Sequence, residues 1–244
     1  MINGRYVYCI LEGEKIQDIG KIGLFDSNVY TVGHKDINAM VSAIPFKETH
    51  ANVDNMIAHQ RVVEASRKIG TTLPVKFGVM IKTEEGVKKL LTKSYKDFRL
   101  KISKFKDKDE FGVKVIFDKN NIEKIKRKVN SNSDEIKKIK KEMSGVGDGT
   151  AYFLKMKMDE AIKNETLKKI DKMSGEIHSL LASSADDNCL LKTDLDQVIL
   201  NAAYLVKKKD QNNFNLKWRE LQEKYKSDGL MFHKSGPWAP YSFC

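Results

Sequence analysis

The sequence predicts an α+β protein with two domains, which span residues 1–118 and 119–244. Three observations lead to this prediction. Short apolar runs alternate with turn residues in the first half, a helical apolar stripe opens the second half, and each half ends on a strand-like segment. We expect a ferredoxin-like antiparallel sheet with helices on one face in the first domain. In the second we expect a smaller α+β unit with a long helical hairpin.

The first half begins with a strand pattern, because residues 5–11 alternate around two tyrosines and an isoleucine. Three further apolar runs follow, and they are separated by Asp26, Ser27, Asn28 and Gly33, which are typical of turns. The runs predict antiparallel strands at residues 22–25, 29–32 and 37–44.

Two helical segments are expected next. The first begins at about Asn52 and ends at Gly70, a common C-terminal stop. Its buried stripe is predicted to hold Ala58, Val62, Ala65 and Ile69. The second helix follows a short strand at residues 77–81 and is capped by Thr83. Its buried side is predicted to hold Val87, Leu91, Phe98 and Ile102. A strand at residues 111–117 closes the first domain.

The second half opens on apolar residues at spacings of three and four. They are Ile122, Ile125, Val129, Ile136, Ile139 and Met143. Asn132 is the polar position in this coiled-coil-like seam and is predicted to fix its register. Residues 145–149 are rich in glycine and end the helix, and a second helix over residues 152–181 completes the hairpin. Strands at residues 189–195 and 197–206, a helix that buries Phe214, Trp218, Leu221 and Tyr225, and a strand at 230–234 follow.

Charge is concentrated at the start of the second half. The chain has a net charge of +11, and residues 119–142 hold nine lysine or arginine residues against four acidic ones. Nucleic-acid sites usually combine arginine forks or stacking rings with positive charge, whereas this segment has one arginine, Arg127, and no aromatic residue. We interpret the segment as a solvated helix face, with an acidic protein partner and nucleic acid as the alternatives.

Membrane and secretory features are not found. No apolar run approaches the roughly 18 residues of a membrane span, and the N-terminus has no signal-peptide core. The three cysteines, Cys9, Cys189 and Cys244, form no CxxC pair, which favours reduced thiols in a cytoplasmic protein.

No residue pattern nominates a catalytic or metal site. The five histidines lack the spacing of a helical zinc site, and for His59 a structural or surface role is favoured over proton transfer. Asp186 and Asp187, and Asp194 and Asp196, lack the glycine and distal glutamate of a calcium loop. We therefore expect no enzyme, no cofactor and no metal.

The segment Gly236-Pro-Trp-Ala-Pro-Tyr-Ser-Phe243 is the most distinctive in the chain. Pro237 and Pro240 fix φ and remove two backbone donors, so we expect neither a helix nor a central strand. The resulting stiff ribbon carries three aromatic rings, those of Trp238, Tyr241 and Phe243. Packing of these rings on the first domain is favoured, and contact with a partner is the alternative.

This motif resembles the closing motif of the gas vesicle protein GvpF/GvpL family, with Ala239 where proline is usual. Leu73-Pro-Val-Lys-Phe-Gly78 resembles the internal family motif Leu-Pro-x-Arg-Phe-Gly, with Lys76 in place of arginine. Lysine keeps the charge but loses the bidentate fork. Further segments match in the family's order, at residues 6–10, 59–64, 110–114 and 203–206.

The resemblance implies a non-enzymatic accessory component of the gas vesicle in the cytoplasm. Such proteins contact the small hydrophobic shell protein of the GvpA type, together with other gas vesicle accessory proteins, and keep it from aggregating while a vesicle is nucleated. No nucleic acid and no lipid membrane is implied as a partner. The candidate partner-binding residues are Lys76, Phe77, Trp238, Tyr241 and Phe243.

Two alternatives from other classes remain open. An RNA-binding module would use exposed aromatic residues on a ferredoxin-like sheet, which residues 111–117 faintly suggest. An enzyme would need a polar cleft between the domains with convergent titratable groups.

Overall fold

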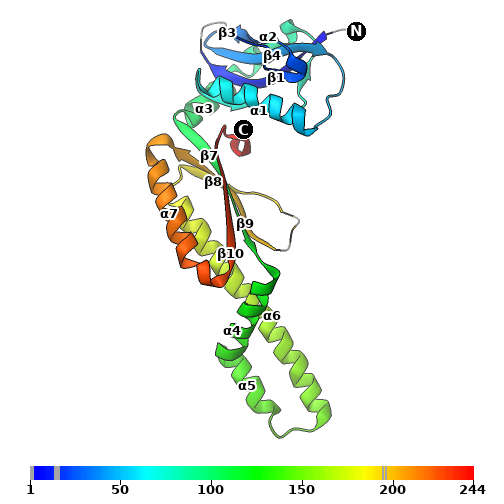
Figure 1. Cartoon of the computed structure of the whole chain (residues 1–244), viewed down its shortest axis with the longest axis vertical. Coiled ribbons are helices and arrows are strands. Elements are labelled where there is room, and N and C mark those ends of the chain that lie inside the picture. Colours follow the sequence, from blue (N-terminus) through cyan, green and yellow to red (C-terminus); the bar gives the residue numbers. More distant parts are fainter. Residues whose placement is uncertain (1–2, 14–16, 194, 196) are drawn as a thin grey trace. The chain divides into compact units, whose positions relative to one another are not determined.

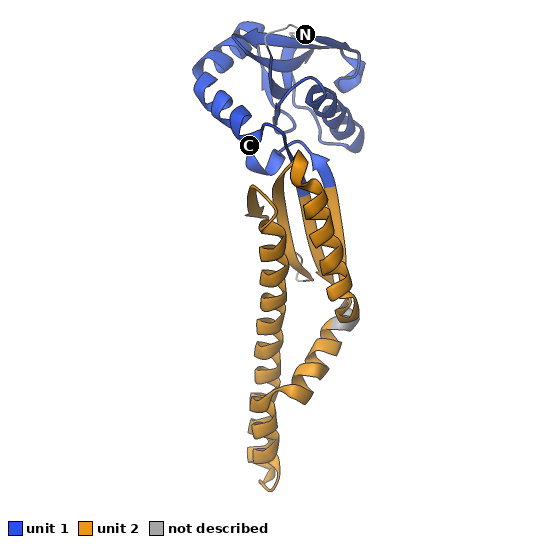
Figure 2. Ribbon diagram, turned by 90° about the vertical axis from the view of Figure 1, so that its left-hand side faces the viewer, with its two compact units in different colours: residues 1–111, 236–244 blue, residues 112–235 orange. Residues whose placement is uncertain are grey.

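The computed structural model describes residues 3–13, 17–193, 195 and 197–244 (Figure 1). It combines helices with two sheets, which confirms the predicted α+β class. The chain forms two compact units, one of residues 1–111 with 236–244 and one of residues 112–235 (Figure 2). The expected boundary follows residue 118, whereas residues 112–118 fall in the second unit and the terminal segment Gly236–Cys244 falls in the first.

The sheet of the first unit has the strand order β2-β3-β4-β1-β5, and β6 also pairs with β1. Its strands are β1 (Asn3–Glu12), β2 (Asp18–Gly20), β3 (Val29–His34), β4 (Ile37–Pro45), β5 (Thr72–Pro74) and β6 (Met80–Ile81). The six consecutive residues 6–11 of β1 are at most 1% exposed, so both faces of this strand are covered. The ferredoxin-like arrangement is not confirmed, since β1 to β4 follow one another without an α-helix between them.

One strand prediction in this unit is wrong, and another is too long. Leu24–Asp26 forms a short 3-10 turn, η1, in place of a strand at residues 22–25, and β2 is the edge strand. The turn is fixed by contacts that apolar content does not reveal: the Leu24 amide donates to the Tyr8 hydroxyl at 2.9 Å, and Phe25 has a φ of 55°. Likewise, the strand expected at residues 77–81 starts at Met80, because a turn precedes it.

Three helices accompany the sheet: α1 (Val53–Arg67), α2 (Glu84–Lys93) and α3 (Tyr95–Phe105). Asn52 and Thr83 cap α1 and α2, since their side chains accept the amides of Asn55 and Gly86. The helix predicted after Thr83 is in fact two helices, which meet at Ser94.

The buried face of α1 differs from the predicted stripe. Ile69 lies beyond the helix and is 40% exposed. The residues that α1 does bury are Asn55, His59, Val62, Val63 and Ser66. Polar side chains can be buried here because they are satisfied: for example, Asn55 donates to the His50 carbonyl and Ser66 to the Val62 carbonyl. As a consequence, an apolar side of α1 that holds Val53, Met56 and Ile57 faces outward.

The second unit contains a four-stranded sheet of order β10-β7-β9-β8 and several helices. Its strands are β7 (Lys108–Phe117), β8 (Asp187–Leu190), β9 (Val198–Lys207) and β10 (Leu230–Trp238); β7 and β10 each continue into residues of the first unit. Its helices are α4 (Lys119–Asn132), α5 (Asp134–Met143), α6 (Asp148–Ala182) and α7 (Gln211–Lys224). α4 and α5 pack against α6, the arrangement expected as a helical hairpin (Figure 1).

The first arm of this hairpin is two helices and not one. Ser133 interrupts it and caps α5 by accepting the Ile136 amide. Asn132 is exposed at the end of α4, so the prediction that it lies in the seam is wrong. The lysine residues of α5 lie on its exposed side, which agrees with a solvated face; they are Lys137, Lys138, Lys140 and Lys141. Within the described ranges, no helix is long and apolar enough to cross a membrane.

Candidate functional site

The terminal segment is anchored in the first unit by small residues. Ala239 is fully buried and belongs to a core cluster that also contains Tyr6 and Tyr8. Trp238 is 39% exposed, so its ring is only partly covered, and it lies beside α1 residues of the same unit. The segment begins at the end of β10, which lies at the edge of its sheet, so the prediction that it is not a central strand is confirmed. It closes with a 3-10 turn, η4 (Tyr241–Phe243), although no helix is predicted there.

Hydrogen bonds to a buried carboxylate hold the end of this segment. Glu110 is 7% exposed, and its two oxygens accept the amide of Ser242 at 2.8 Å and its hydroxyl at 2.7 Å. Burial raises the pKa of the Glu110 carboxyl, while the hydrogen bonds from Ser242 act to lower it. The Tyr241 hydroxyl donates to Gln60 of α1 at 3.0 Å.

Arg67 fixes the start of the segment. Its guanidinium donates to the Pro237 carbonyl at 3.2 Å. The same group pairs with Asp109 at 2.5 Å and with Glu64 at 2.6 Å. The terminal segment is therefore tied to α1 and β7 at several points within one unit.

The loop of residues 73–78 is held by a buried tyrosine and a buried histidine. The Gly78 amide donates to the Tyr6 hydroxyl at 3.0 Å, and this hydroxyl lies 3.0 Å from Nδ1 of His59. Nε2 of His59 lies 3.1 Å from the Val75 carbonyl. The phenol has one proton, so it donates to Nδ1, and the imidazole carries its own proton on Nε2, from which it donates to Val75. Burial lowers the pKa of His59 to about 4.

This network gives His59 a structural role, in agreement with the role favoured by sequence. The loop is fastened further by its backbone, since the Val75 amide donates to the Tyr8 carbonyl at 3.0 Å. Phe77 is half-buried, and its ring centroid lies 5.9 Å from that of Tyr6. Lys76 is the exposed residue beside it.

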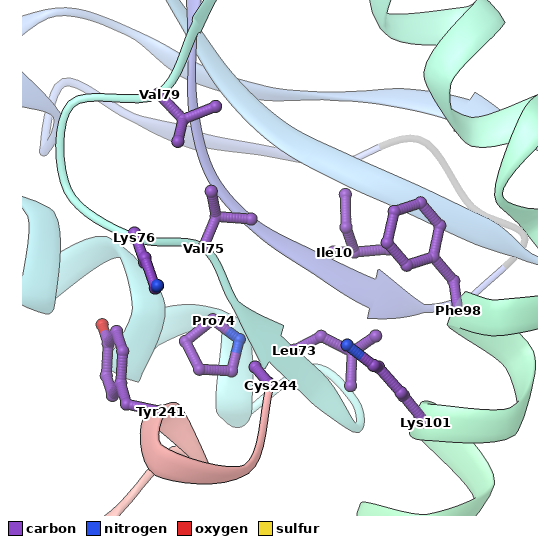
Figure 3. Close-up of a pocket in the computed structure, with 10 residues that line it drawn as sticks. All are labelled: Ile10, Leu73, Pro74, Val75, Lys76, Val79, Phe98, Lys101, Tyr241 and Cys244. Atoms are coloured by element: carbon purple, nitrogen blue, oxygen red, sulfur yellow. The ribbon is translucent and has the colours of Figure 1, made fainter.

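A pocket of about 270 Å³ opens between this loop, β5, α3 and the terminal segment (Figure 3). Its lining is mostly apolar, with two lysine residues: Ile10, Leu73, Pro74, Val75, Lys76, Val79, Phe98, Lys101, Tyr241 and Cys244. The ammonium nitrogens of Lys76 and Lys101 are directed toward the pocket from opposite sides, with Pro74 and Cys244 between them (Figure 3).

A wider groove of about 540 Å³ runs along the outward side of α1. It is lined by Val53, Met56, Ile57, Gln60, Glu110, Trp238 and Tyr241. Val53 is 71% exposed, and Met56 and Ile57 are each 52% exposed. Tyr241 lines both the pocket and the groove, and burial raises the pKa of its hydroxyl.

The structure brings together some of the predicted partner-binding residues. Lys76 and Tyr241 meet at the pocket, and Trp238 and Tyr241 at the groove. Phe77 and Phe243 line neither of them. The α1 residues of the groove are not among the predicted site residues, although their spacing of three and four, at 53, 56 and 57, is a helical signal in its own right.

Metal binding and RNA binding have little support in the described part of the structure. Among the residues it describes, no cluster of three or more histidine, cysteine, aspartate or glutamate side chains could hold a metal ion. Asp194 and Asp196 lie outside the described residues. Phe111 and Phe117 of β7 are 3% and 1% exposed, so neither ring is available to stack on an RNA base.

Comparison with known proteins gives one consistent result. The family described as gas vesicle synthesis protein GvpL/GvpF matches residues 4–244. Gas vesicle protein F1 of Halobacterium salinarum is 24% identical, with 100% of this chain and 93% of that protein covered.

Two crystal structures have the same fold as this chain. The gas vesicle protein GvpF from Anabaena sp. PCC7120 aligns with a TM-score of 0.83 at 21% identity, over 99% of this chain and 98% of that one. GvpF from Microcystis aeruginosa aligns with a TM-score of 0.75 at 21% identity, over 100% of this chain and 99% of that one.

Proposed function

Since the chain belongs to the GvpL/GvpF family of gas vesicle synthesis proteins, we propose that it binds the hydrophobic shell protein of the vesicle and keeps it from aggregating. The family confirms the predicted gas vesicle assignment; the shell protein as partner is the step that the proposal adds. In this role the protein acts by binding, during nucleation and assembly of the vesicle, and performs no catalytic step. Other gas vesicle accessory proteins are proposed as further partners.

The groove along α1 is the observation that supports the proposal. It places Val53, Met56 and Ile57 beside the partly exposed ring of Trp238. Contiguous apolar surface of this kind typically marks an interaction site, and tryptophan is enriched among residues that dominate binding energy.

The chemistry of the expected partner matches this groove. A subunit whose apolar face is destined for a gas-filled wall exposes that face before assembly and aggregates through it. An apolar groove of about 540 Å³ can cover part of such a face. In this proposal Trp238 and Tyr241 are contact residues. Phe77 supports the neighbouring loop through its contacts with Tyr6 and His59.

The test is co-purification of tagged protein with the shell protein, before and after nuclease treatment. Met56→Asp and Ile57→Asp place a charge in the groove and should weaken shell-protein binding by about tenfold or more, because an unpaired carboxylate would be desolvated. Light scattering should show that these variants no longer delay aggregation of the shell protein. Their melting temperatures should stay close to that of the parent, since both side chains are half exposed.

Leu100→Asp is the matched control. Leu100 is 71% exposed on α3 of the same unit and lines neither the groove nor the pocket. This variant should bind as the parent does. Groove variants with unchanged binding, or recovery of nucleic acid in place of the shell protein, would overturn the proposal. An RNA-binding role has no supporting observation.

A further inference from the structure

The pocket beside β5 differs from the groove in size and in charge. Its volume of about 270 Å³ lies just below the roughly 300–1,000 Å³ of pockets that bury a small-molecule ligand. One or two side chains fit this space better than a cofactor does. Leu73, Pro74 and Phe98 supply apolar walls against which an aliphatic group can pack.

The charged side chains of the pocket are all basic. Lys76 and Lys101 line it, and none of the lining side chains is acidic. Among the described residues, neither ammonium group has an ion-pair partner. The two nitrogens are directed toward the pocket from opposite sides (Figure 3). An incoming carboxylate would therefore find positive charge on both sides of the apolar floor.

The positions of these lysine residues are set before any ligand arrives. Lys76 lies in the 73–78 loop, whose carbonyl at Val75 and amide at Gly78 are bound by His59 and Tyr6. Lys101 lies on the regular helix α3. A fixed backbone reduces the conformational entropy that binding would otherwise have to overcome, so even a small contact can be selective.

We propose that this pocket binds an acidic, aliphatic peptide segment of a partner protein. One glutamate or aspartate carboxylate lies between the ammonium groups of Lys76 and Lys101, and a neighbouring aliphatic side chain packs against Leu73, Pro74 and Phe98. A phosphate-bearing ligand fits less well, because the lining offers no arginine fork. The inference does not rest on the shell-protein groove, since none of the exposed α1 residues of the groove lines the pocket.

The probe is a terminally blocked hexapeptide, Ala-Leu-Glu-Leu-Val-Ala, titrated calorimetrically into the full-length protein. A counterpart with glutamine in place of glutamate should bind about tenfold more weakly, because it removes the charge-assisted contact. Lys76→Gln and Lys101→Gln should each reduce affinity for the glutamate peptide several-fold, by an amount that shrinks with added salt. Lys76→Arg keeps the charge and should retain binding.

Two controls separate this inference from a general charge effect and from the groove. Lys96→Gln removes an exposed lysine from the same helix, outside the pocket, and should leave affinity unchanged. Met56→Asp should also leave peptide binding unchanged, whatever it does to shell-protein binding. Equal affinity for the glutamate and glutamine peptides, or unchanged binding by both lysine variants, would overturn the proposal. Binding of decanoate but of neither peptide would overturn it as well, in favour of a lipid-like occupant.

Discussion

Each unit of this protein contains a tyrosine hydrogen-bonded to a histidine, and the two pairs are used differently. In the first unit, the Tyr6 hydroxyl lies 3.0 Å from Nδ1 of His59, and in the second, the Tyr204 hydroxyl lies 2.8 Å from Nδ1 of His178. Both tyrosines are fully buried, and burial raises the pKa of each. His59 is 4% exposed, whereas His178 is half-buried.

The first pair positions a loop, and the second joins a helix to a strand. His59 and Tyr6 bind the backbone of the 73–78 loop, which carries Lys76 to the pocket. His178 and Tyr204 connect α6 with β9. α6 itself buries six of its 35 residues, so most of its surface faces solvent. The same pair of side chains thus fixes the loop beside the pocket in the first unit, and in the second it is one of several contacts that hold α6, which also packs against α4, α5 and α7.

The largest effect should come from removing the terminal segment, because it belongs to the first unit alone. Truncation after Ser235 takes Ala239 and Tyr241 from the first unit and leaves Glu110 without its partner Ser242. We expect the free energy of unfolding to fall by about 3–6 kcal/mol, as lost packing and an unsatisfied buried carboxylate add up. Urea unfolding of the parent and the truncated chain measures this loss. Trp238→Ala is the control and should cost about 1 kcal/mol or less; equal losses in the two variants would contradict this account.

The second-largest effect should be a loss of stability at low pH, caused by His59 of the first unit. The ordinary pKa of histidine is about 6.5, and His59 is held at about 4 in the folded chain. Below pH 6.5 the unfolded chain takes up a proton that the folded chain does not, so the free energy of unfolding falls as pH drops from about 6.5 to about 4. The loss is up to about 3 kcal/mol, it levels off below pH 4, and it is absent above pH 6.5.

Urea unfolding at pH 7 and pH 4.5 checks this, with His59→Leu as the matched variant. That variant should be less stable at pH 7, because Tyr6 and Val75 lose their partner, but its stability should change less with pH. A pH dependence equal to that of the parent would show that another group carries it.

The tyrosine hydroxyls give a smaller and more direct comparison. Tyr6→Phe leaves the Gly78 amide and Nδ1 of His59 unpaired in the core and should cost about 2–3 kcal/mol. Tyr204→Phe leaves a half-buried histidine that water can reach and should cost about 1 kcal/mol. Native-state hydrogen exchange at the amides of β1 and β9 measures the stability of the first and the second unit separately. Equal losses would mean that the burial of the histidine does not matter.

The smallest effect is expected on the exposed face of α5. Changing Lys137, Lys138, Lys140 and Lys141 to glutamine should alter the free energy of unfolding by about 0.5 kcal/mol or less and lower solubility instead. Shell-protein binding should be unchanged. A large loss of binding at unchanged stability would show that this face contacts an acidic partner.

Sequence patterns predicted the positions of several elements, even where they did not predict which side chains are buried. Residues 5–11 were expected as a strand and lie in β1, and the expected helix from Asn52 to Gly70 contains α1. Thr83 was expected as a cap and does cap α2. The family, too, could be named from short motifs, because their order along the chain is specific even where each is weak.

Predicted and observed burial differ where the position of a side chain depends on tertiary contacts. On α1, buried Asn55, His59 and Ser66 displace the apolar stripe, since each finds a hydrogen-bond partner that only the folded chain supplies. In the terminal segment the three rings are the predicted packing residues, yet the small Ala239 is fully buried and Trp238 is 39% exposed. The pocket could not be predicted, because Lys76 and Lys101 meet through tertiary structure and not through spacing.

The return of Gly236–Cys244 to the first unit has a consequence for how the protein is made. A ribosome adds roughly 5–20 residues per second, and domains generally fold as they emerge. Here the core around Tyr6 and Tyr8 lacks Ala239 until residues 112–235 have been translated, an interval on the order of 10 s. During this interval the core of the nascent first unit is incomplete, because its closing segment has not yet been synthesised. Synthesis of the second unit sets the earliest time at which the groove and the pocket can exist.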